Sequence, residues 1–298
     1  MKKLSLILAL IMTLACVTGA TAEQSRMKIA VFYENIYSGV QATNQDMETV
    51  LTSLRDAGME LLYMSPDSWK RDRDTLAPLL EKLNIGIEGM HGHCYFTQDP
   101  DTTAYIEMVD LAVEAGAKNL LIVPGFINTG NTAEAIQSIV QGMQKAVDYG
   151  KEKNLPVLME DFDGLRAPYN CIAGMQYFMN AVDGLGCAFD TGNWVMFHED
   201  EMAAFELFAD KIVTVHLKDR ADEPQHPGGY ANICADLTES YACAIGSGTM
   251  RIREILQSLK AMDYQGNVIV ELYGCDPEFV LEDILKSIQW LRQEESMQ

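Results

Sequence analysis

Short apolar runs alternate with longer segments of helical periodicity from Met27 onward. The runs are rich in Val, Ile and Leu, and they are continuous instead of alternating with polar residues. This pattern is typical of strands that are covered on both faces of a parallel sheet. We predict eight strands, at residues 28–33, 60–64, 86–90, 119–123, 156–159, 187–189, 212–215 and 267–270.

The segments between these runs carry their apolar residues on one helical face. Three clear examples are Ile136, Ile139, Val140, Met143 and Val147; Ile252, Ile255, Leu256, Leu259 and Met262; and Val280, Ile284, Ile288 and Leu291. Asn131 is placed to cap the first of these helices, with Glu134 reaching back toward it. Eight strand–helix units predict an α/β fold of the closed (β/α)₈ TIM barrel type. A Rossmann fold is disfavoured because no dinucleotide fingerprint of spaced glycines follows the first strand.

No Pro-rich or Gly/Ser-rich linker divides the chain, so residues 27–298 are predicted to form a single barrel domain. The longest irregular stretch, residues 220–247, contains Pro224 and Pro227 and follows the seventh predicted strand. A loop of this length in a compact domain is usually functional. We expect it to lie over the C-terminal mouth of the barrel as a lid.

The first 22 residues have the pattern of a signal peptide. Lys2 and Lys3 precede an apolar run that is short for a membrane span, and Ala20 and Ala22 supply small residues for cleavage. The prediction is export to the periplasm or the extracellular space. A short membrane anchor and a lipoprotein signal with lipid on Cys16 are the alternatives. No other apolar stretch is long enough to span a membrane.

The formal net charge of −21 argues against a nucleic-acid partner, because phosphate backbones are bound by Lys and Arg. An acidic surface favours solubility and weakly concentrates cations. None of the seven cysteines lies in a Cys-x-x-Cys pair, which disfavours a thiolate zinc site. Export permits disulfides, but their pairing is not predicted.

Metal-capable side chains end four consecutive predicted strands: Glu160, Asp190, His216 and Glu271. The C-terminal ends of the strands form the active-site face of a (β/α)₈ barrel, so these side chains are expected to converge. Each residue alone fits a helix cap or an ion pair. Three converging carboxylates would repel one another strongly, and a cation resolves that conflict. We therefore predict one divalent metal ion. Carboxylate and imidazole ligands favour Mn²⁺ or Mg²⁺, with Zn²⁺ or Co²⁺ as alternatives.

Five segments carry a family resemblance: residues 157–161 (VLMED), 189–193 (FDTGN), 215–219 (VHLKD), 246–248 (GSG) and 270–271 (VE). In this order they resemble the xylose isomerase-like TIM barrels, which include sugar phosphate isomerase/epimerases, ketose 3-epimerases, inosose dehydratases and AP endonucleases. The resemblance covers Met27 to about Leu291. It implies that Glu160, Asp190, His216 and Glu271 bind one metal. The resemblance to the epimerase branch further implies that Glu160 and Glu271 also act as the catalytic acid/base pair.

The sequence departs from this pattern at several positions. Asn193 stands where ketose epimerases usually have a His, and Tyr63 ends strand two where many members have Glu. Arg220 is only a candidate for the substrate-holding Arg of that branch. The three-metal AP endonucleases need additional histidines, and one of them is absent at Val123-Pro124-Gly125. The nuclease branch is therefore disfavoured.

Further polar and aromatic residues near strand ends are predicted to contact substrate: His91, His93, Asn193, Trp194, Lys218 and Arg220. Each has a structural alternative, such as a turn hydrogen bond for the histidines, an ion pair with Asp219 for Lys218, or simple packing for Trp194. His198 and His226 are expected at the surface.

These features predict a metal-dependent isomerase or epimerase that acts on a small unphosphorylated keto-sugar or cyclitol through an enediolate. Export favours an unphosphorylated substrate because phosphorylated sugars are scarce outside the cytoplasm. The alternatives are a lyase of the inosose dehydratase or keto-glycoside eliminase type, and a non-catalytic sugar-binding barrel. The sequence leaves a homo-oligomer open.

Overall fold

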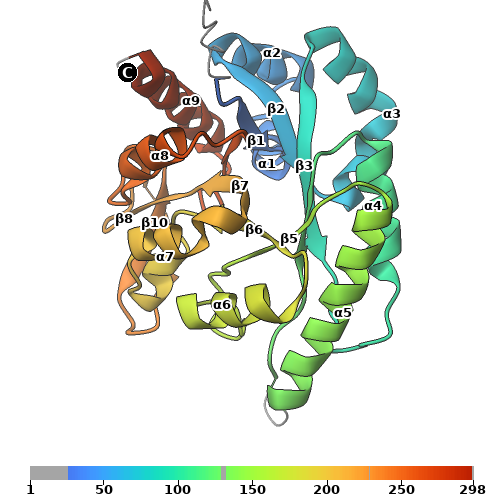
Figure 1. Cartoon of the computed structure of the whole chain (residues 1–298). Helices are drawn as coiled ribbons and strands as arrows, with labels where there is room; N and C mark the ends of the chain where they lie inside the picture. The colour runs from blue at the N-terminus through green and yellow to red at the C-terminus, as the bar shows by residue number, and fades with distance from the viewer. Residues whose placement is uncertain (1–25, 129–131, 228, 297–298) are drawn as a thin grey trace, which may run out of the picture.

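A computed structural model of the protein describes residues 26–128, 132–227 and 229–296. Eight parallel strands close into a barrel that is surrounded by helices (Figure 1). Around the barrel the strands are β1 (Ile29–Phe32), β11 (Val268–Val270), β7 (Ile212–Leu217), β6 (Gly186–Asp190), β5 (Val157–Glu160), β4 (Leu120–Val123), β3 (Gly86–His93) and β2 (Met59–Met64). The predicted (β/α)₈ fold is therefore confirmed. The predicted signal peptide and the predicted cap at Asn131 lie outside the described residues.

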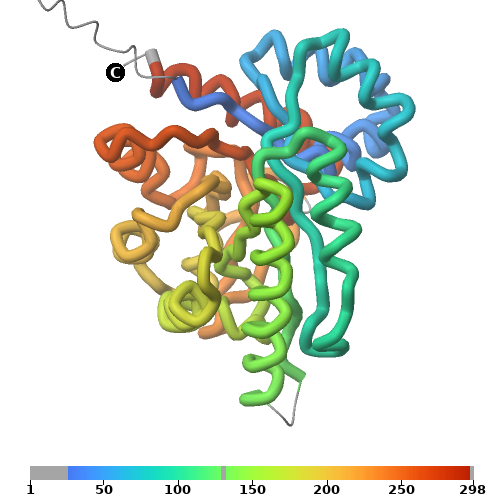
Figure 2. The backbone as a smooth tube through the Cα atoms, turned by 45° about the vertical axis from the view of Figure 1, so that its right-hand side comes forward, coloured from blue at the N-terminus to red at the C-terminus, as the bar shows by residue number. Residues whose placement is uncertain are grey.

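The helices form the outer layer of the barrel. They are α1 (Tyr33–Thr43), α2 (Met47–Ala57), α3 (Pro66–Leu83), α4 (Ala104–Glu114), α5 (Thr132–Glu152), α6 (Ile172–Ala181), α7 (Glu201–Phe208), α8 (Ile252–Ala261) and α9 (Val280–Ser296). Two short 3₁₀ helices flank α7: η1 (Trp194–Phe197) and η2 (Ala209–Lys211). The last helix, α9, packs against α1 and α2 from the other end of the chain, so the outer layer closes on itself (Figure 2).

The barrel strands are buried on both faces, which explains why their sequences are continuously apolar. The inward side chains form a small cluster of their own inside the barrel: Ala30, Phe32, Tyr63, Leu121, Leu158, Ala188 and Ile269. The outward side chains join the larger core between strands and helices. Packing on both sides fixes the strand register and thereby the positions of the residues that end each strand.

Local sequence sets where several helices begin. α2 follows Asp46, whose carboxylate accepts the N–H of Thr49 at 2.9 Å. α3 follows Ser65, whose hydroxyl accepts the N–H of Ser68 at 3.0 Å, and Pro66 occupies its first turn. The chain thus passes from β2 into α3 through Ser65 alone, so the β2–α3 connection forms no long loop over the mouth of the barrel.

The stretch 220–247, predicted to be irregular, instead contains a three-stranded antiparallel sheet. Its strands are β8 (Asp219–Ala221), β10 (Glu239–Cys243) and β9 (Asn232–Ile233), in that order. The prediction missed it because the strands are very short and pair across many intervening residues. His226 in this stretch is also less exposed than predicted. Its Nε2 lies 2.8 Å from Asp283 Oδ2, and its ring stacks on Phe279.

Two further expectations concern membranes and disulfides. Within residues 26–128, 132–227 and 229–296, every helix is too short or too polar to cross a membrane. The six cysteines of the described part of the chain, from Cys94 to Cys275, are all free thiols.

One close contact in the outer layer gives a stability prediction. A Cβ atom on Gly142 in α5 would lie 2.1 Å from Cδ1 of the fully buried Phe96 ring. We expect Gly142→Ala to lower the free energy of unfolding by about 1–3 kcal/mol, because overpacking a rigid ring forces side chains or backbone to shift. Denaturant unfolding followed by circular dichroism measures this, with exposed Gln141→Ala in the same helix as the matched control. A gain in stability, as helix propensity alone predicts, would contradict the contact.

Candidate metal centre and active-site cavity

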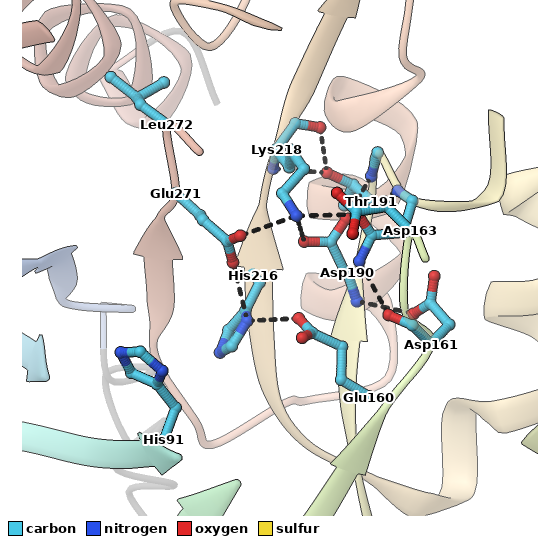
Figure 3. A network of polar contacts seen from close by, with 12 residues as sticks. His91, Glu160, Asp161, Asp163, Asp190, Thr191, His216, Lys218, Glu271 and Leu272 are labelled. Atoms are coloured by element: carbon cyan, nitrogen blue, oxygen red, sulfur yellow. Dashed lines mark hydrogen bonds and ion pairs between the residues drawn. The ribbon is translucent and has the colours of Figure 1, made fainter. Parts of the chain in front are cut away.

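The four predicted metal ligands meet at one end of the barrel. Glu160 and Asp190 end β5 and β6, His216 lies near the end of β7, and Glu271 directly follows β11. One ligand atom from each lies within 4.8 Å of all the others (Figure 3). All four side chains are buried. Adjacent parallel strands produce this convergence, since Asp190 and His216, for example, are register partners.

Two cationic groups separate the three carboxylates of this cluster. His216 Nδ1 lies 2.6 Å from Glu160 Oε1 and 3.2 Å from Glu271 Oε2. Lys218 Nζ lies 2.7 Å from Glu271 Oε1 and 3.3 Å from Asp190 Oδ2. Positive and negative groups therefore alternate through the cluster, which reduces the repulsion among the carboxylates.

The pKa values reflect competition between burial and these neighbours. Burial opposes the charged form of His216, but the carboxylates of Glu160 and Glu271 raise its pKa to about 10. Burial raises the pKa of Asp190 to about 7, and Lys218 limits this rise. For Glu271, burial also favours the neutral acid, yet Lys218 and His216 hold its pKa below the ordinary range. At neutral pH without a cation, the cluster therefore retains protons on His216 and partly on Asp190.

Two carboxylate oxygens of the cluster lack hydrogen bonds within the described part of the chain. Asp190 accepts the N–H groups of Gly192 and Asn193 through Oδ1, while its buried Oδ2 accepts none. Glu271 Oε2 is also buried and accepts none, and His216 directs its Nδ1 toward Glu160 and Glu271. Buried polar atoms normally have partners, so these exceptions suit a ligand. The set of donors fits one divalent cation.

Lys218 is held in place by its neighbours. Its Nζ donates to Asn193 Oδ1 at 2.8 Å, and Asn193 Nδ2 donates to the carbonyl oxygen of Asp161 at 2.8 Å. The backbone of Lys218 pairs with Thr191 Oγ1 at 2.8 and 2.9 Å. The ammonium group is therefore directed into the carboxylate cluster and does not form the ion pair with Asp219 that was the alternative prediction.

Asp219 binds the chain segment before α8 to the end of β7. Its carboxylate accepts the N–H groups of Gly246, Gly248 and Met250 at 2.8, 3.0 and 3.2 Å. A Cβ on Gly248 would lie 2.3 Å from Asp219 Oδ1, so a side chain does not fit there. The two sequence segments VHLKD and GSG thus form one structural unit that supports Lys218.

A cavity of about 360 Å³ opens beside the cluster. Its lining comprises Phe32, Glu34, Asn35, His91, His93, Leu121, Val123, Glu160, Phe162, Asp163, Asn193, Lys218, Glu271 and Tyr273. Of the predicted substrate contacts, His91, His93, Asn193 and Lys218 therefore reach the cavity.

Comparison with known proteins agrees with this arrangement. The family model for the xylose isomerase-like TIM barrel matches residues 51–294. The chain belongs to the xylose isomerase-like TIM barrel family. Inosose dehydratase from Lacticaseibacillus casei is 21% identical over 225 residues, which are 69% of this chain and 75% of that enzyme. Sugar-modifying epimerases, isomerases and dehydratases are among the members of this family.

Two solved structures are similar in fold. The IolI protein with a bound zinc atom has a TM-score of 0.69 and 17% identity, covering 91% of this chain and 99% of that one. The 3-keto-D-glucoside 4-epimerase from E. coli has a TM-score of 0.63 and 15% identity, covering 90% of this chain and 100% of that one. Identities this low establish a shared barrel and no more.

Two predicted substrate contacts of this family member lie elsewhere. Trp194 is 1% exposed and does not line the cavity, because η1 turns its indole toward the helix layer, where it stacks on Phe208. Arg220 is equally buried and does not line the cavity either. It reaches the site only through Asp163, whose Oδ2 lies 3.4 Å from Arg220 Nη2.

Glu34 also lines the cavity, although it was not among the predicted site residues. Its Oε2 lies 3.2 Å from His91 Nε2, and its Oε1 accepts the N–H of Ser65 at 2.9 Å. Burial opposes ionisation of Glu34, but the His91 contact holds its pKa at about 2. His91 is also fixed by stacking on Tyr63. Glu34 lies just beyond β1, so the search for polar residues at strand ends could have found it.

Cation binding should release protons, because His216 and Asp190 hold them at neutral pH while metal ligands must offer free lone pairs. Both pKa values are raised, so the apparent affinity for Mn²⁺ should increase with pH between about 6 and 9, by roughly tenfold per pH unit for each proton released. Calorimetric titration of the metal-free protein in buffers of different ionisation enthalpy measures the release. The exposed His198→Gln is the matched control. A pH-independent affinity without proton release would contradict the assignment.

Proposed function

We propose that this protein is a metal-dependent isomerase or epimerase of a small, unphosphorylated keto-sugar or cyclitol. The observation that carries the proposal is the approach of two carboxylates to one imidazole nitrogen: Glu160 and Glu271 lie 2.6 and 3.2 Å from the same His216 Nδ1. Both residues also line the cavity. One carboxylate can take the proton from the carbon beside a carbonyl, and the other can return a proton to the same or the neighbouring carbon.

A divalent cation held by Glu160, Asp190, His216 and Glu271 would supply Lewis-acid polarisation of a substrate carbonyl oxygen. Mn²⁺ or Mg²⁺ is the favoured ion because three of the four ligands are carboxylates, and Zn²⁺ or Co²⁺ are the alternatives.

Other cavity residues suit the same reaction. Lys218 presents a fixed ammonium group, so it can stabilise the oxygen that gains negative charge when the adjacent C–H proton leaves. His91, oriented by Glu34, can exchange hydrogen bonds with a substrate hydroxyl. Asn193 lines the cavity beside Lys218 and adds a further polar contact.

The charge of the cavity supports an unphosphorylated substrate. Four carboxylates line it (Glu34, Glu160, Asp163 and Glu271), and Lys218 is the single Lys or Arg among its lining residues. A phosphate group would meet repulsion from most of this surface. Export directed by residues 1–22 is part of the proposal. It also favours an unphosphorylated substrate, since the substrate would then be found outside the cytoplasm.

A lyase is the second candidate, favoured by the similarity to inosose dehydratase. The same carboxylates would remove the proton, and a hydroxyl or alkoxyl group would then leave from the neighbouring carbon. A non-catalytic sugar-binding barrel is less well supported because binding alone requires no pair of carboxylates at the reacting position.

Conservative substitution tests the two carboxylates. Glu160→Gln and Glu271→Gln should each slow hydrogen exchange at the carbon beside the carbonyl by roughly 10²–10⁴-fold, because each removes a group that transfers a proton. The measurement is NMR of deuterium uptake by keto-sugars and cyclitol ketones in D₂O with the metal-loaded protein. Exposed Glu152→Gln on α5 is the control.

The products of the same incubation separate the reaction types. Deuterium uptake with retention of all substituents indicates an isomerase or epimerase, and loss of water or an alcohol indicates a lyase. Exchange at the unaltered rate in both Gln variants would refute the assigned roles.

Lys218 should be required for turnover but not for cation binding. Lys218→Met should lower kcat by roughly 10²–10³-fold, because an oxyanion would lose its charged donor. Cation affinity should stay the same or rise, because Asp190 and Glu271 lose a competing positive charge. Steady-state kinetics and calorimetric titration of the same variant check the two effects, and loss of both would indicate a purely structural role.

A further inference from the structure

The cavity has two chemically different sides. Glu160, Glu271 and Lys218 line the side at the metal centre. The residues that line it from β3, β4 and the segment after β5 include the apolar or aromatic His93, Leu121, Val123 and Phe162, together with His91 and Asp163. Hydroxyl groups are suited to the polar side, whereas a flat apolar face is suited to the aromatic side.

An aromatic cluster extends this apolar side to the surface. We call it the aromatic rim, and it consists of His93, Tyr95, Phe126 and Phe162. The centroids of His93 and Tyr95 are 5.4 Å apart with nearly parallel rings, and those of Phe126 and Phe162 are also 5.4 Å apart. His93 joins the two pairs, at 6.4 Å from both Phe126 and Phe162. The rings therefore form one continuous surface.

The aromatic rim is open to solvent at the cavity mouth. Tyr95 is 38% exposed, and His93 is also exposed, while Phe126 and Phe162 are half-buried. Tyr273, which lines the cavity and is 59% exposed, follows β11, the strand opposite β4 in the barrel. Aromatic side chains thus stand on both sides of the opening. Apolar surface left in water costs about 25 cal/mol per Å², and such patches beside a cavity commonly mark ligand contacts.

We propose that the aromatic rim binds the second ring of a glycoside substrate, while the keto-sugar ring lies against Glu160 and Glu271. This inference rests on the proposed function and narrows its substrate class. The second ring is either a pyranose, whose C–H face stacks on aromatic rings, or an aryl aglycone. Both offer a flat apolar face of the kind that Phe162 and Tyr95 present. The cavity volume of about 360 Å³ lies within the range of roughly 300–1,000 Å³ seen for sites of drug-sized ligands.

The test compares probes with and without a second ring. We would titrate the full-length, metal-loaded protein with methyl β-D-glucopyranoside, phenyl β-D-glucopyranoside and cellobiose, and measure affinity by calorimetry. At least one ring-bearing probe should bind about tenfold more tightly than the methyl glycoside, since tenfold corresponds to about 1.4 kcal/mol. The probe that gains affinity identifies the second ring as aryl or pyranose.

Two variants link this preference to the aromatic rim. Phe162→Ala should remove most of the preference for a second ring, so that the ring-bearing probes lose more affinity than the methyl glycoside. Tyr95→Ala should reduce the preference as well. Because Tyr95 is exposed, this variant is expected to fold normally, so that a loss of preference could not be attributed to misfolding. Leu165→Ala, at a 59% exposed residue outside the cavity lining, is the control.

Equal affinity for all three probes, or an equal loss for all three in Phe162→Ala, would overturn the inference. Failure of the proposed function gives a different result. A ring preference without deuterium uptake from any keto-sugar would refute the isomerase or epimerase and retain the subsite. Deuterium uptake without a ring preference would refute the subsite and retain the isomerase or epimerase.

Discussion

Three carboxylates lie buried within a few ångströms of one another at the end of an apolar barrel. The residues around them are arranged so as to reduce the free-energy cost of burying these charges. Removing an ionised group from water costs several kcal/mol even in a relaxed protein interior. His216 and Lys218 offset the cost by alternating with Glu160, Asp190 and Glu271. This offset is incomplete, because Asp190 keeps a pKa of about 7. The remaining imbalance suits the cluster to a cation.

The surrounding residues make Lys218 part of a rigid support. Asn193 and Thr191 bind its side chain and backbone, and Asp219 gathers the N–H groups of Gly246 and Gly248. The replacement of the usual His by Asn193 acquires a physical meaning here. The Asn193 amide donates to the carbonyl oxygen of Asp161 and accepts from Lys218 at the same time. A neutral imidazole could do both only with its proton on the nitrogen that faces Asp161. The Asn at this position thus serves to orient the ammonium group of Lys218.

The barrel and the four candidate ligands would suit each of the proposed reactions, since isomerisation, epimerisation and elimination would each begin with removal of a proton beside a carbonyl. The differences lie in the residues that surround the metal centre: the Glu34–His91 pair, Asp163 with Arg220 behind it, and the aromatic rim. These groups come from the ends of β1, β3, β4, β5 and β7, where loops vary without disturbing the barrel. Substrate choice is therefore expected to depend on them more than on the metal ligands.

The barrel and the four convergent residues could be predicted from the sequence, because continuous apolar strands and their polar ends are local patterns. Glu160, Asp190, His216 and Glu271 could be named since parallel strands all end at the same face. Where individual side chains point after a strand ends became clear in the folded structure. Folding directs Trp194 into the core, places Arg220 behind Asp163, and pairs Glu34 with His91. These outcomes depend on packing and hydrogen bonds between residues tens of positions apart, which no local pattern of apolar and polar residues encodes.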